Sequence, residues 1–169
     1  MKKICWLLSC ILMFQLLLGC SRKEEEILQP VNFYYINSEI SYNTPNGVIR
    51  AEIREGAEFQ DIEELLQVYL EGPASPELRN FMPLSVKLLS CAVENDSIYI
   101  LLSSQFAELS GVKLTTECSA ILMTVHDYLG TNTLYVRVEG SQLDDKDTFI
   151  LTMDDLVLSD SVSSELPKE

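Results

Sequence analysis

Apolar residues recur at helical spacing between Asp61 and Leu70, and they mark one face of a helix. Asp61 suits the N-cap position, and Glu64 three residues later fits a capping box. Gly72-Pro73 follows. Glycine tolerates the closing conformation of a helix and proline cannot continue one, so this pair is an end signal. The pattern predicts a first helix over Asp61–Leu70.

A second helix is predicted over Thr116–Leu129, with Thr115 as its cap and Gly130 as its stop. Its apolar residues fall on one stripe along the helix. They are Cys118, Ile121, Leu122, Val125 and Leu129.

Between the helices, Val86–Val93 and Ile98–Ser103 are rich in branched apolar residues. They flank Glu94-Asn95-Asp96-Ser97, which indicates a β-hairpin. The run Ile98–Leu102 is apolar on both faces, which is typical of a strand that is covered on both sides or lies in the middle of a sheet.

Further strands are predicted at Val31–Asn37, Val48–Arg54, residues 134–138 and Phe149–Met153. The first two are joined by a loop that holds Thr44-Pro45-Asn46-Gly47, a turn sequence. Leu134, Val136 and Val138 alternate with polar neighbours, which predicts that one face of this strand is exposed to solvent. The predicted fold class is α+β: a small mixed or antiparallel sheet with two helices on one face, in the order ββαββαβ.

Several short motifs carry a family resemblance: Tyr69-Leu70-Glu71-Gly72-Pro73, Met82-Pro83, Lys87-Leu88-Leu89-Ser90, the strand exit Ser103…Phe106 and Val136-Arg137-Val138-Glu139-Gly140. With the order of elements over residues 48–140, they resemble the GerMN domain of sporulation and spore-germination proteins. The family's proline is usually followed by a small residue such as glycine, where this chain has Leu84-Ser85. The resemblance implies a role in sporulation or germination, in which similar domains build rings or bridges between membranes.

The charge of the chain excludes some partners. The 169 residues carry a formal net charge of −14. Lys2 and Lys3 are the only charges among the first twenty residues, so their removal leaves 10 basic against 26 acidic residues, a net −16. Such a chain is repelled by nucleic acid and by anionic lipid. Attachment to a membrane must therefore be covalent or hydrophobic.

The N-terminus has the features of a bacterial lipoprotein signal peptide. Met1-Lys2-Lys3 is basic, Ile4–Leu18 is apolar but too short to span a bilayer, and Leu17-Leu18-Gly19-Cys20 resembles a lipobox. We expect the thiol of Cys20 to receive a diacylglyceryl group, which would hold the protein on the extracytoplasmic face of the cell membrane. The alternative is an ordinary secretory peptide in which the cysteine occurs by chance.

The expected organisation has four parts. These are a signal peptide at 1–19, the lipidated Cys20 with a tether at 20–30, the GerMN-like domain at 31–153, and an acidic tail at 154–169 that we expect to be disordered.

Few residues suggest a catalytic or metal-binding role. His126 is the only histidine, and no Ser or Cys nucleophile with an orienting carboxylate can be matched to it, so a structural or surface role is favoured. Cys91 and Cys118 are not spaced as metal ligands; we favour two buried thiols over a disulfide. No catalytic, cofactor or metal site is assigned.

Two other groups have a simpler interpretation. Asp144, Asp145 and Asp147 lack the ligand pattern of an EF-hand loop, which favours a solvated turn over a calcium site. The aromatic run Phe33–Tyr35 is typical of sheet packing, with a ligand platform as the alternative.

The sequence thus predicts a non-catalytic, lipid-anchored interaction module that associates with an envelope protein or with itself, through a sheet edge or a helix face. The alternative is a small-ligand-binding lipoprotein in which Phe33–Tyr35, Tyr99 and Tyr135 line a pocket. A hydrolase would need His126 beside a nucleophile.

Overall fold

The structure is a computed structural model that describes residues 30–39, 47–55 and 59–156. Helices and strands follow the predicted order, with one short strand and two 3₁₀ turns added. In chain order they are β1 (Val31–Asn37), β2 (Ile49–Arg54), α2 (Ile62–Glu71), β3 (Leu78–Arg79), β4 (Leu88–Glu94), β5 (Ser97–Leu102), η1 (Ser104–Glu108), α3 (Gly111–Leu129), β6 (Thr133–Val138), β7 (Phe149–Thr152) and η2 (Met153–Asp155).

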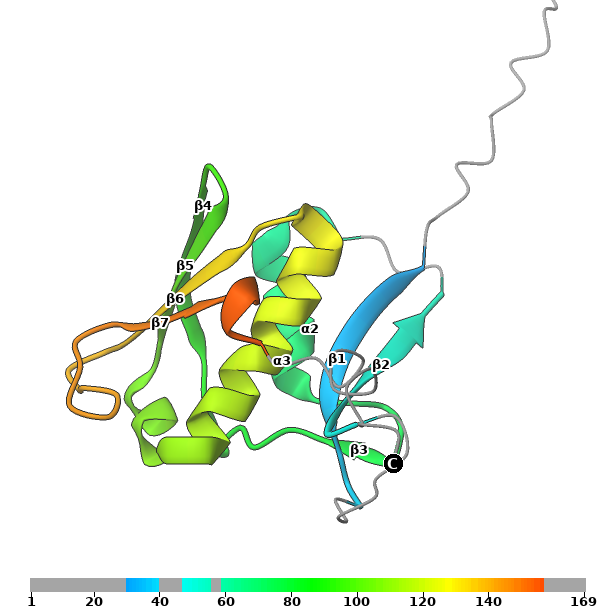
Figure 1. Cartoon of the computed structure of the whole chain (residues 1–169), viewed down its shortest axis with the longest axis horizontal. Coiled ribbons are helices and arrows are strands. Elements are labelled where there is room, and N and C mark those ends of the chain that lie inside the picture. Colours follow the sequence, from blue (N-terminus) through cyan, green and yellow to red (C-terminus); the bar gives the residue numbers. More distant parts are fainter. Residues whose placement is uncertain (1–29, 40–46, 56–58, 157–169) are drawn as a thin grey trace, which may run out of the picture.

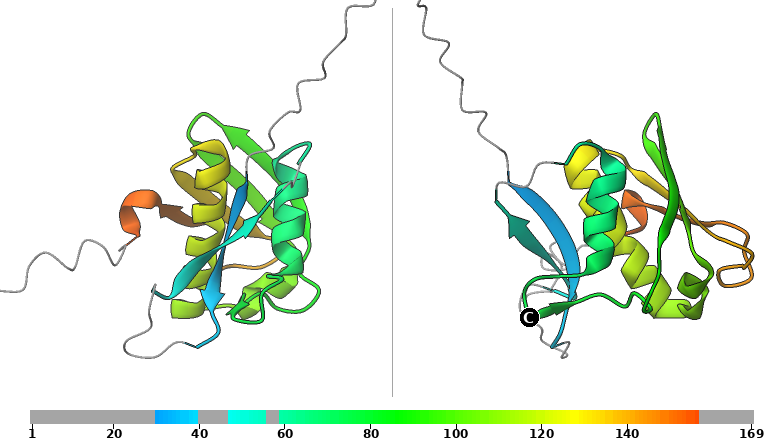
Figure 2. Two further views of the ribbon diagram at one scale, coloured as in Figure 1. Left: turned by 90° about the vertical axis from the view of Figure 1, so that its right-hand side faces the viewer. Right: turned by 180° about the vertical axis from the view of Figure 1, so that it is seen from behind.

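The elements form three layers, with the two helices between two sheets (Figures 1 and 2). One sheet has the strand order β2-β1-β3 and the other the order β4-β5-β6-β7. Helix α3 contacts β1 on one side and β6 and β7 on the other, while α2 contacts β4. The α+β class is confirmed. The four-stranded sheet is the expected mixed sheet with both helices on one face.

The N-terminal strands differ from the expectation, because they do not join that mixed sheet. They form a separate sheet on the far side of the helices. The reason lies in α3, whose buried residues reach well beyond the predicted stripe and include Leu114, Ala120 and Thr124. A helix that is apolar on two faces needs a cover on each of them.

Helix α2 is bounded as the sequence predicts. The carboxylate of Asp61 accepts a hydrogen bond from the Glu64 amide at 2.9 Å. Gly72 ends the helix at φ 93°, a conformation that glycine adopts at little cost. The Glu64 carboxylate accepts from the amide of Gln60, one residue before the predicted capping-box partner.

Helix α3 begins at Gly111, not at Thr116, so the predicted cap was wrong. Thr115 lies inside the first turn, where its hydroxyl donates to the Gly111 carbonyl oxygen at 3.2 Å. The amide of Gly111 instead meets the carboxylate of Asp144, with N···O distances of 3.2 and 3.3 Å. A residue 33 positions away supplies this contact, which local sequence patterns do not reveal. The stop at Gly130 is confirmed, with φ 77°.

In the four-stranded sheet, β4 and β5 form the predicted hairpin around Asn95-Asp96, with an irregular register between Leu88 and Ser90. Strand β5 pairs parallel with β6, and α3 makes the crossover between them. Strand β7 closes the sheet as an antiparallel edge strand. The central position expected for β5 is therefore confirmed.

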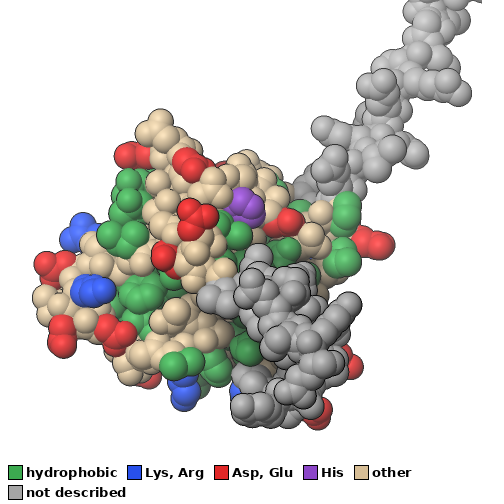
Figure 3. All heavy atoms as spheres, viewed as in Figure 1, with side chains coloured by type: hydrophobic (Ala, Val, Ile, Leu, Met, Phe, Trp, Pro, Cys, Tyr) green, Lys and Arg blue, Asp and Glu red, His purple; other side chains and the backbone are tan. Residues whose placement is uncertain are grey.

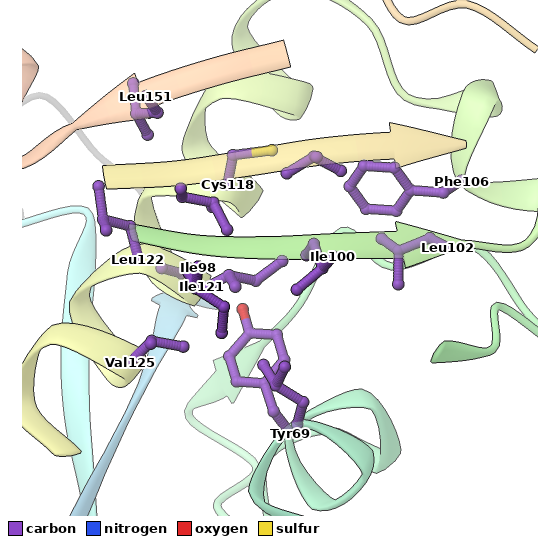
Figure 4. Close-up of a cluster of buried hydrophobic side chains, with 14 of the residues drawn as sticks. Tyr69, Ile98, Ile100, Leu102, Phe106, Cys118, Ile121, Leu122, Val125 and Leu151 are labelled. Carbon is purple, nitrogen blue, oxygen red and sulfur yellow. The ribbon is translucent and has the colours of Figure 1, made fainter. Parts of the chain in front are cut away.

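The core lies between the helices and the inner face of this sheet (Figure 4). Inner-face side chains of β5 and β6 pack against α3 and α2 with almost no exposed surface. They include Ile98, Ile100, Leu102, Leu134 and Val136, which meet Ile121, Leu122, Val125 and Tyr69. Leu129, predicted on the same stripe, is 43% exposed at the end of α3.

Helix α3 also covers the open side of β1. The backbone amide of Tyr34 donates to the hydroxyl of Thr124 at 2.9 Å, and Asn32 donates to the Asp127 carboxylate at 2.9 Å. The Thr124 hydroxyl donates in turn to the Ala120 carbonyl oxygen. The helix therefore takes the place of a neighbouring strand along part of β1.

Several predictions lie outside the described residues. They are the signal peptide, Cys20 and the tether up to Gln29, positions 44–46 of the loop after β1, and residues 157–169 of the tail. The expected end of the domain at 153 falls inside the turn η2. None of the described helices is long and apolar enough to cross a bilayer.

Candidate interaction surfaces

A row of apolar side chains crosses the outer face of the four-stranded sheet, with one residue on each strand. Tyr99 is paired with Ala92 on one side and with Tyr135 on the other, and Tyr135 is paired with Ile150. Tyr99 is 39% exposed and Ile150 53%. We call Ala92, Tyr99, Tyr135 and Ile150 the tyrosine row.

The tyrosine row has a defined shape. The rings of Tyr99 and Tyr135 stack with a centroid distance of 4.4 Å and an interplanar angle of 13°. Cross-strand aromatic pairs of this kind stabilise a sheet and hold each other in one position. Arg137 is exposed one pleat further along β6 and adds a positive charge at the margin. The result is a fixed apolar surface in the middle of a sheet face.

The two aromatic groups of the pocket hypothesis do not come together. Phe33 and Tyr35 are fully buried between β1 and the helices, where Phe33 meets Phe59 and Tyr35 stacks on Tyr69 at 5.0 Å. Tyr99 lies on the opposite side of the molecule, on the outer face of the other sheet. The sheet-packing interpretation of Phe33–Tyr35 therefore fits the structure, and the ligand-platform interpretation does not.

Strand β2 turns its charged side chains inward. Arg54 places its guanidinium 4.4 Å from the centroid of the Phe33 ring and donates to the Gly72 carbonyl oxygen at 3.0 Å. The Glu52 carboxylate accepts from the amides of Ala74 and Ser75 at 3.3 and 2.9 Å. The two side chains hold the Gly-Pro corner after α2, one of the motifs that carry the family resemblance.

These contacts also affect the acidity of Glu52. Burial alone would raise its pKa, but the amides of Ser75 and Ala74 and the neighbouring Arg54 hold the pKa below its ordinary value. The carboxylate therefore stays charged while it binds the corner.

Glu117 is the one acidic side chain with no exposed surface among the described residues. Its two oxygens accept from the Tyr69 hydroxyl at 2.8 Å and from the Phe81 amide at 2.6 Å. Burial raises the pKa of Glu117 to about 7, against the effect of those two hydrogen bonds. A perturbed carboxyl group often marks a reactive site. Here neither Glu117 nor Tyr69 reaches the surface, so the pair joins α2, α3 and the loop at Phe81.

His126 lies near the end of α3, at the surface (Figure 3). Its Nδ1 is 3.0 Å from the Thr131 carbonyl oxygen, which makes Nδ1 the donor because a carbonyl oxygen only accepts. This contact fastens the ring to the turn after the helix. It fits the structural or surface role and gives no support to a hydrolase.

Both described cysteines are free thiols. Cys118 is fully buried against the sheet, as predicted, whereas Cys91 is only partly buried. Burial raises the pKa of each thiol, and the acidic side chains of Glu63 and Asp61 add to the effect at Cys91. Both thiols are therefore poor nucleophiles.

The acidic cluster near the C-terminus forms the predicted turn. Leu143 and Lys146 pair across it, and Asp144 and Asp145 adopt positive φ at the tip. Asp144 is directed to the N-terminus of α3, as described above. Across the described residues, no three His, Cys, Asp or Glu side chains converge as a metal site.

The turn that follows Pro83 closes without glycine. Ser85 adopts φ 67°, and the Val86 amide reaches the Pro83 carbonyl oxygen at 3.4 Å. Leu84 at its tip is 93% exposed. The left-handed conformation at Ser85 explains why a residue such as glycine is favoured in this turn.

These observations define a class of protein: a small α+β domain with exposed apolar side chains on its outer surface. The titratable side chains described above, Glu52, Glu117 and His126, hydrogen-bond to other parts of the fold. Comparisons with known proteins agree with this class. A family model described as "Germane: Sporulation and spore germination" matches residues 32–144. The chain belongs to this family of sporulation and spore-germination proteins.

Solved structures show the same fold. The first GerMN domain of the sporulation protein GerM from Bacillus subtilis matches with a TM-score of 0.57 and 16% identity, over 75% of this chain and 99% of that one. The tandem GerMN domains of GerM match with a TM-score of 0.56 and 15% identity, over 80% of this chain. The chain covers 49% of the tandem structure. A comparison with curated protein sequences finds no match.

Family membership supports a non-catalytic role in sporulation or germination, and the family is not known for an enzymatic activity. The sequence had pointed to Tyr99 and Tyr135, but as pocket residues. It gave no indication that Ile150 and Ala92 continue their row, because the order of strands in a sheet is not a local property. Glu117 had a usable signal: it lies four residues before Ile121 and therefore on the buried stripe.

Proposed function

We propose that this protein is a lipid-anchored, extracytoplasmic module that binds an envelope protein during sporulation or germination. Family membership supports the process, and the signal sequence with Cys20 supports the anchor. The observation that carries the proposal is the tyrosine row, which keeps aromatic and aliphatic surface in water at the middle of a sheet face.

The chemistry of the row suggests the kind of partner. Tyrosine is enriched at protein interfaces because it offers a large, rigid contact area with a polar tip. The rest of the chain is strongly acidic, and acidic side chains are scattered over the surface in Figure 3. Electrostatic complementarity with the chain as a whole therefore favours a partner with an apolar patch and a net positive charge, while Arg137 at the margin of the row favours an acidic group of the partner at that point.

A pull-down from membranes tests the proposal. The tagged, anchored protein would be recovered after mild crosslinking, in wild-type form and with Tyr99→Ser and Ile150→Ser combined. We expect a specific envelope protein with the wild type and a loss of about tenfold or more with the double variant. The matched control is Leu84→Ser, which removes a still more exposed apolar side chain outside the row.

The variant Cys20→Ala tests the anchor independently of the tyrosine row. It should release the protein from the membrane and so lower the recovery of the partner. Two results would overturn the proposal. One is recovery of every form as a free monomer; the other is equal recovery of the partner by the wild type and the double variant.

A further inference from the structure

The loop of residues 81–86, on the way from β3 to β4, is held to the helices by few contacts. It belongs to no helix or strand, and it carries the exposed turn at Leu84. Phe81 and Met82 pack against the core while they remain partly exposed. In the described part of the chain, a single hydrogen bond joins the backbone of this loop to another element. The Phe81 amide donates it to the Glu117 carboxylate of α3, at 2.6 Å.

Glu117 lies in the fold without a counter-ion. Its second oxygen accepts from the Tyr69 hydroxyl of α2 at 2.8 Å, and its side chain has no exposed surface. No Lys, Arg or His nitrogen of the described residues forms an ion pair with it. A buried carboxylate with two hydrogen bonds and no cation is much less stable than the same group in water. An ionised Glu117 therefore gains free energy from any movement that lets water reach it.

On the side of α2 and β1, the groups around Glu117 do not offset this charge. Burial raises the pKa of Tyr69 and of Tyr35, so both hydroxyls stay neutral near pH 7. Arg54, which reaches the Tyr35 hydroxyl at 3.4 Å, already forms an ion pair within β2. Cys118, the next residue of α3, is a buried thiol whose pKa is also raised. Strands β5 and β6 present apolar side chains to the helices.

On the side of the loop, two cations lie close to the Phe81 ring. The guanidinium carbon of Arg79 is 5.3 Å and the Nζ of Lys113 is 5.9 Å from the ring centroid. Both side chains are exposed, and neither forms an ion pair with Glu117. If the loop moved away, these two cations would be near a carboxylate in contact with water, and they would favour its charged form.

We propose that ionisation of Glu117 releases the loop 81–86 from α3, so that water reaches the carboxylate while the rest of the domain stays folded. The loop is the neighbour of Glu117 that is easiest to move, because no strand ladder or helix holds it. The movement would expose Phe81 and Met82, which adds apolar surface beside Leu84.

The direction of the switch follows from the two environments of the carboxyl group. Burial raises the pKa of Glu117 to about 7 in the closed form, against an ordinary value of 4.5 in water. Between these values the closed loop holds a proton that the open loop has released. Raising the pH through this range therefore favours the open loop, and lowering it favours the closed loop. The switch goes beyond the proposed function, because it requires neither the anchor nor the tyrosine row.

Hydrogen exchange on the full chain in detergent micelles tests the switch. The matched reference is the Tyr34 amide, which also donates to a side chain of α3, the Thr124 hydroxyl. We expect the protection of the Phe81 amide to fall about tenfold or more between pH 5 and pH 8, beyond any change at Tyr34. Because a local opening exposes little surface, this exchange should depend only weakly on added urea.

The variant Glu117→Gln separates the charge from the contact. Glutamine keeps an acceptor for the Phe81 amide and does not ionise, so the protection of this amide should no longer change with pH. Two results would overturn the proposal. One is an equal change at Phe81 and Tyr34 in the wild type, which does not depend on how the variant folds. The other is a fall at Phe81 that Glu117→Gln retains. Neither result depends on whether an envelope protein is recovered.

Discussion

Glu117 shows how a single side chain can link the stability of this protein to pH. Its carboxyl group is shielded from water, and its pKa is raised to about 7 from an ordinary value of 4.5. Between these two values the folded chain holds a proton that the unfolded chain has released. The stabilisation from this proton is therefore complete below about pH 4.5 and is lost as the pH rises to about 7.

We predict that Glu117→Gln flattens this dependence. The amide keeps an acceptor for the Phe81 amide and a donor for the Tyr69 hydroxyl, and it does not ionise. In the wild type, the free energy of unfolding should fall by an amount on the order of 3 kcal/mol between pH 5 and pH 8 because of this group. Urea unfolding of both forms across that range measures the difference. Parallel curves for the two forms would show that Glu117 does not titrate there.

At the scale of elements, α3 matters most because it is packed from both sides. Its Thr124 hydroxyl bonds the Tyr34 amide of β1, while Cys118 and Ile121 face the four-stranded sheet. A substitution on this helix can therefore affect one sheet and leave the other in place.

We predict that Thr124→Val destabilises the fold by about 1–3 kcal/mol, because valine keeps the shape and leaves the Tyr34 amide without an acceptor. Thr116→Val is the matched control: the Thr116 hydroxyl donates only to the Val112 carbonyl oxygen of its own helix. Urea unfolding compares the two variants, and hydrogen exchange at Tyr34 locates the effect. If both variants lose the same free energy of unfolding, the loss in Thr124→Val does not come from the contact between α3 and β1.

The elements also show where sequence reasoning succeeds. Asp61, Gly72 and Gly130 are local signals, because a cap or a left-handed turn is decided by one or two residues, and all three were placed correctly. The start of α3 was missed because Asp144 supplies its contact from far along the chain.

The sequence also did not predict which face of β2 is turned toward the core. Alternation of apolar and charged residues over Val48–Arg54 predicts a strand with two different faces, but it does not say which face is turned inward. The Gly-Pro corner and Phe33 decide this, because together they offer Arg54 and Glu52 buried partners. The same alternation leaves the Ile53 side chain 63% exposed.

At the scale of the whole molecule, the chain is strongly acidic, with a formal net charge of −14, and the proposed anchor at Cys20 lies outside the described residues. We predict that the wild type is found in the membrane fraction with a diacylglyceryl group on Cys20, and that Cys20→Ala moves it to the soluble fraction. Fractionation and intact-mass measurement provide the readout. An unmodified Cys20 in membrane-bound protein would contradict the prediction.

The position of β1 at the start of the domain has a mechanical consequence. Any tension that arrives through Pro30 is applied to the end of this strand, which lies between β2 and α3. Hydrogen bonds between antiparallel strands run across the strand direction, so a pull along β1 loads many of them at once. Resistance to force would then depend on the small N-terminal sheet and its contact with Thr124, more than on the large core behind them.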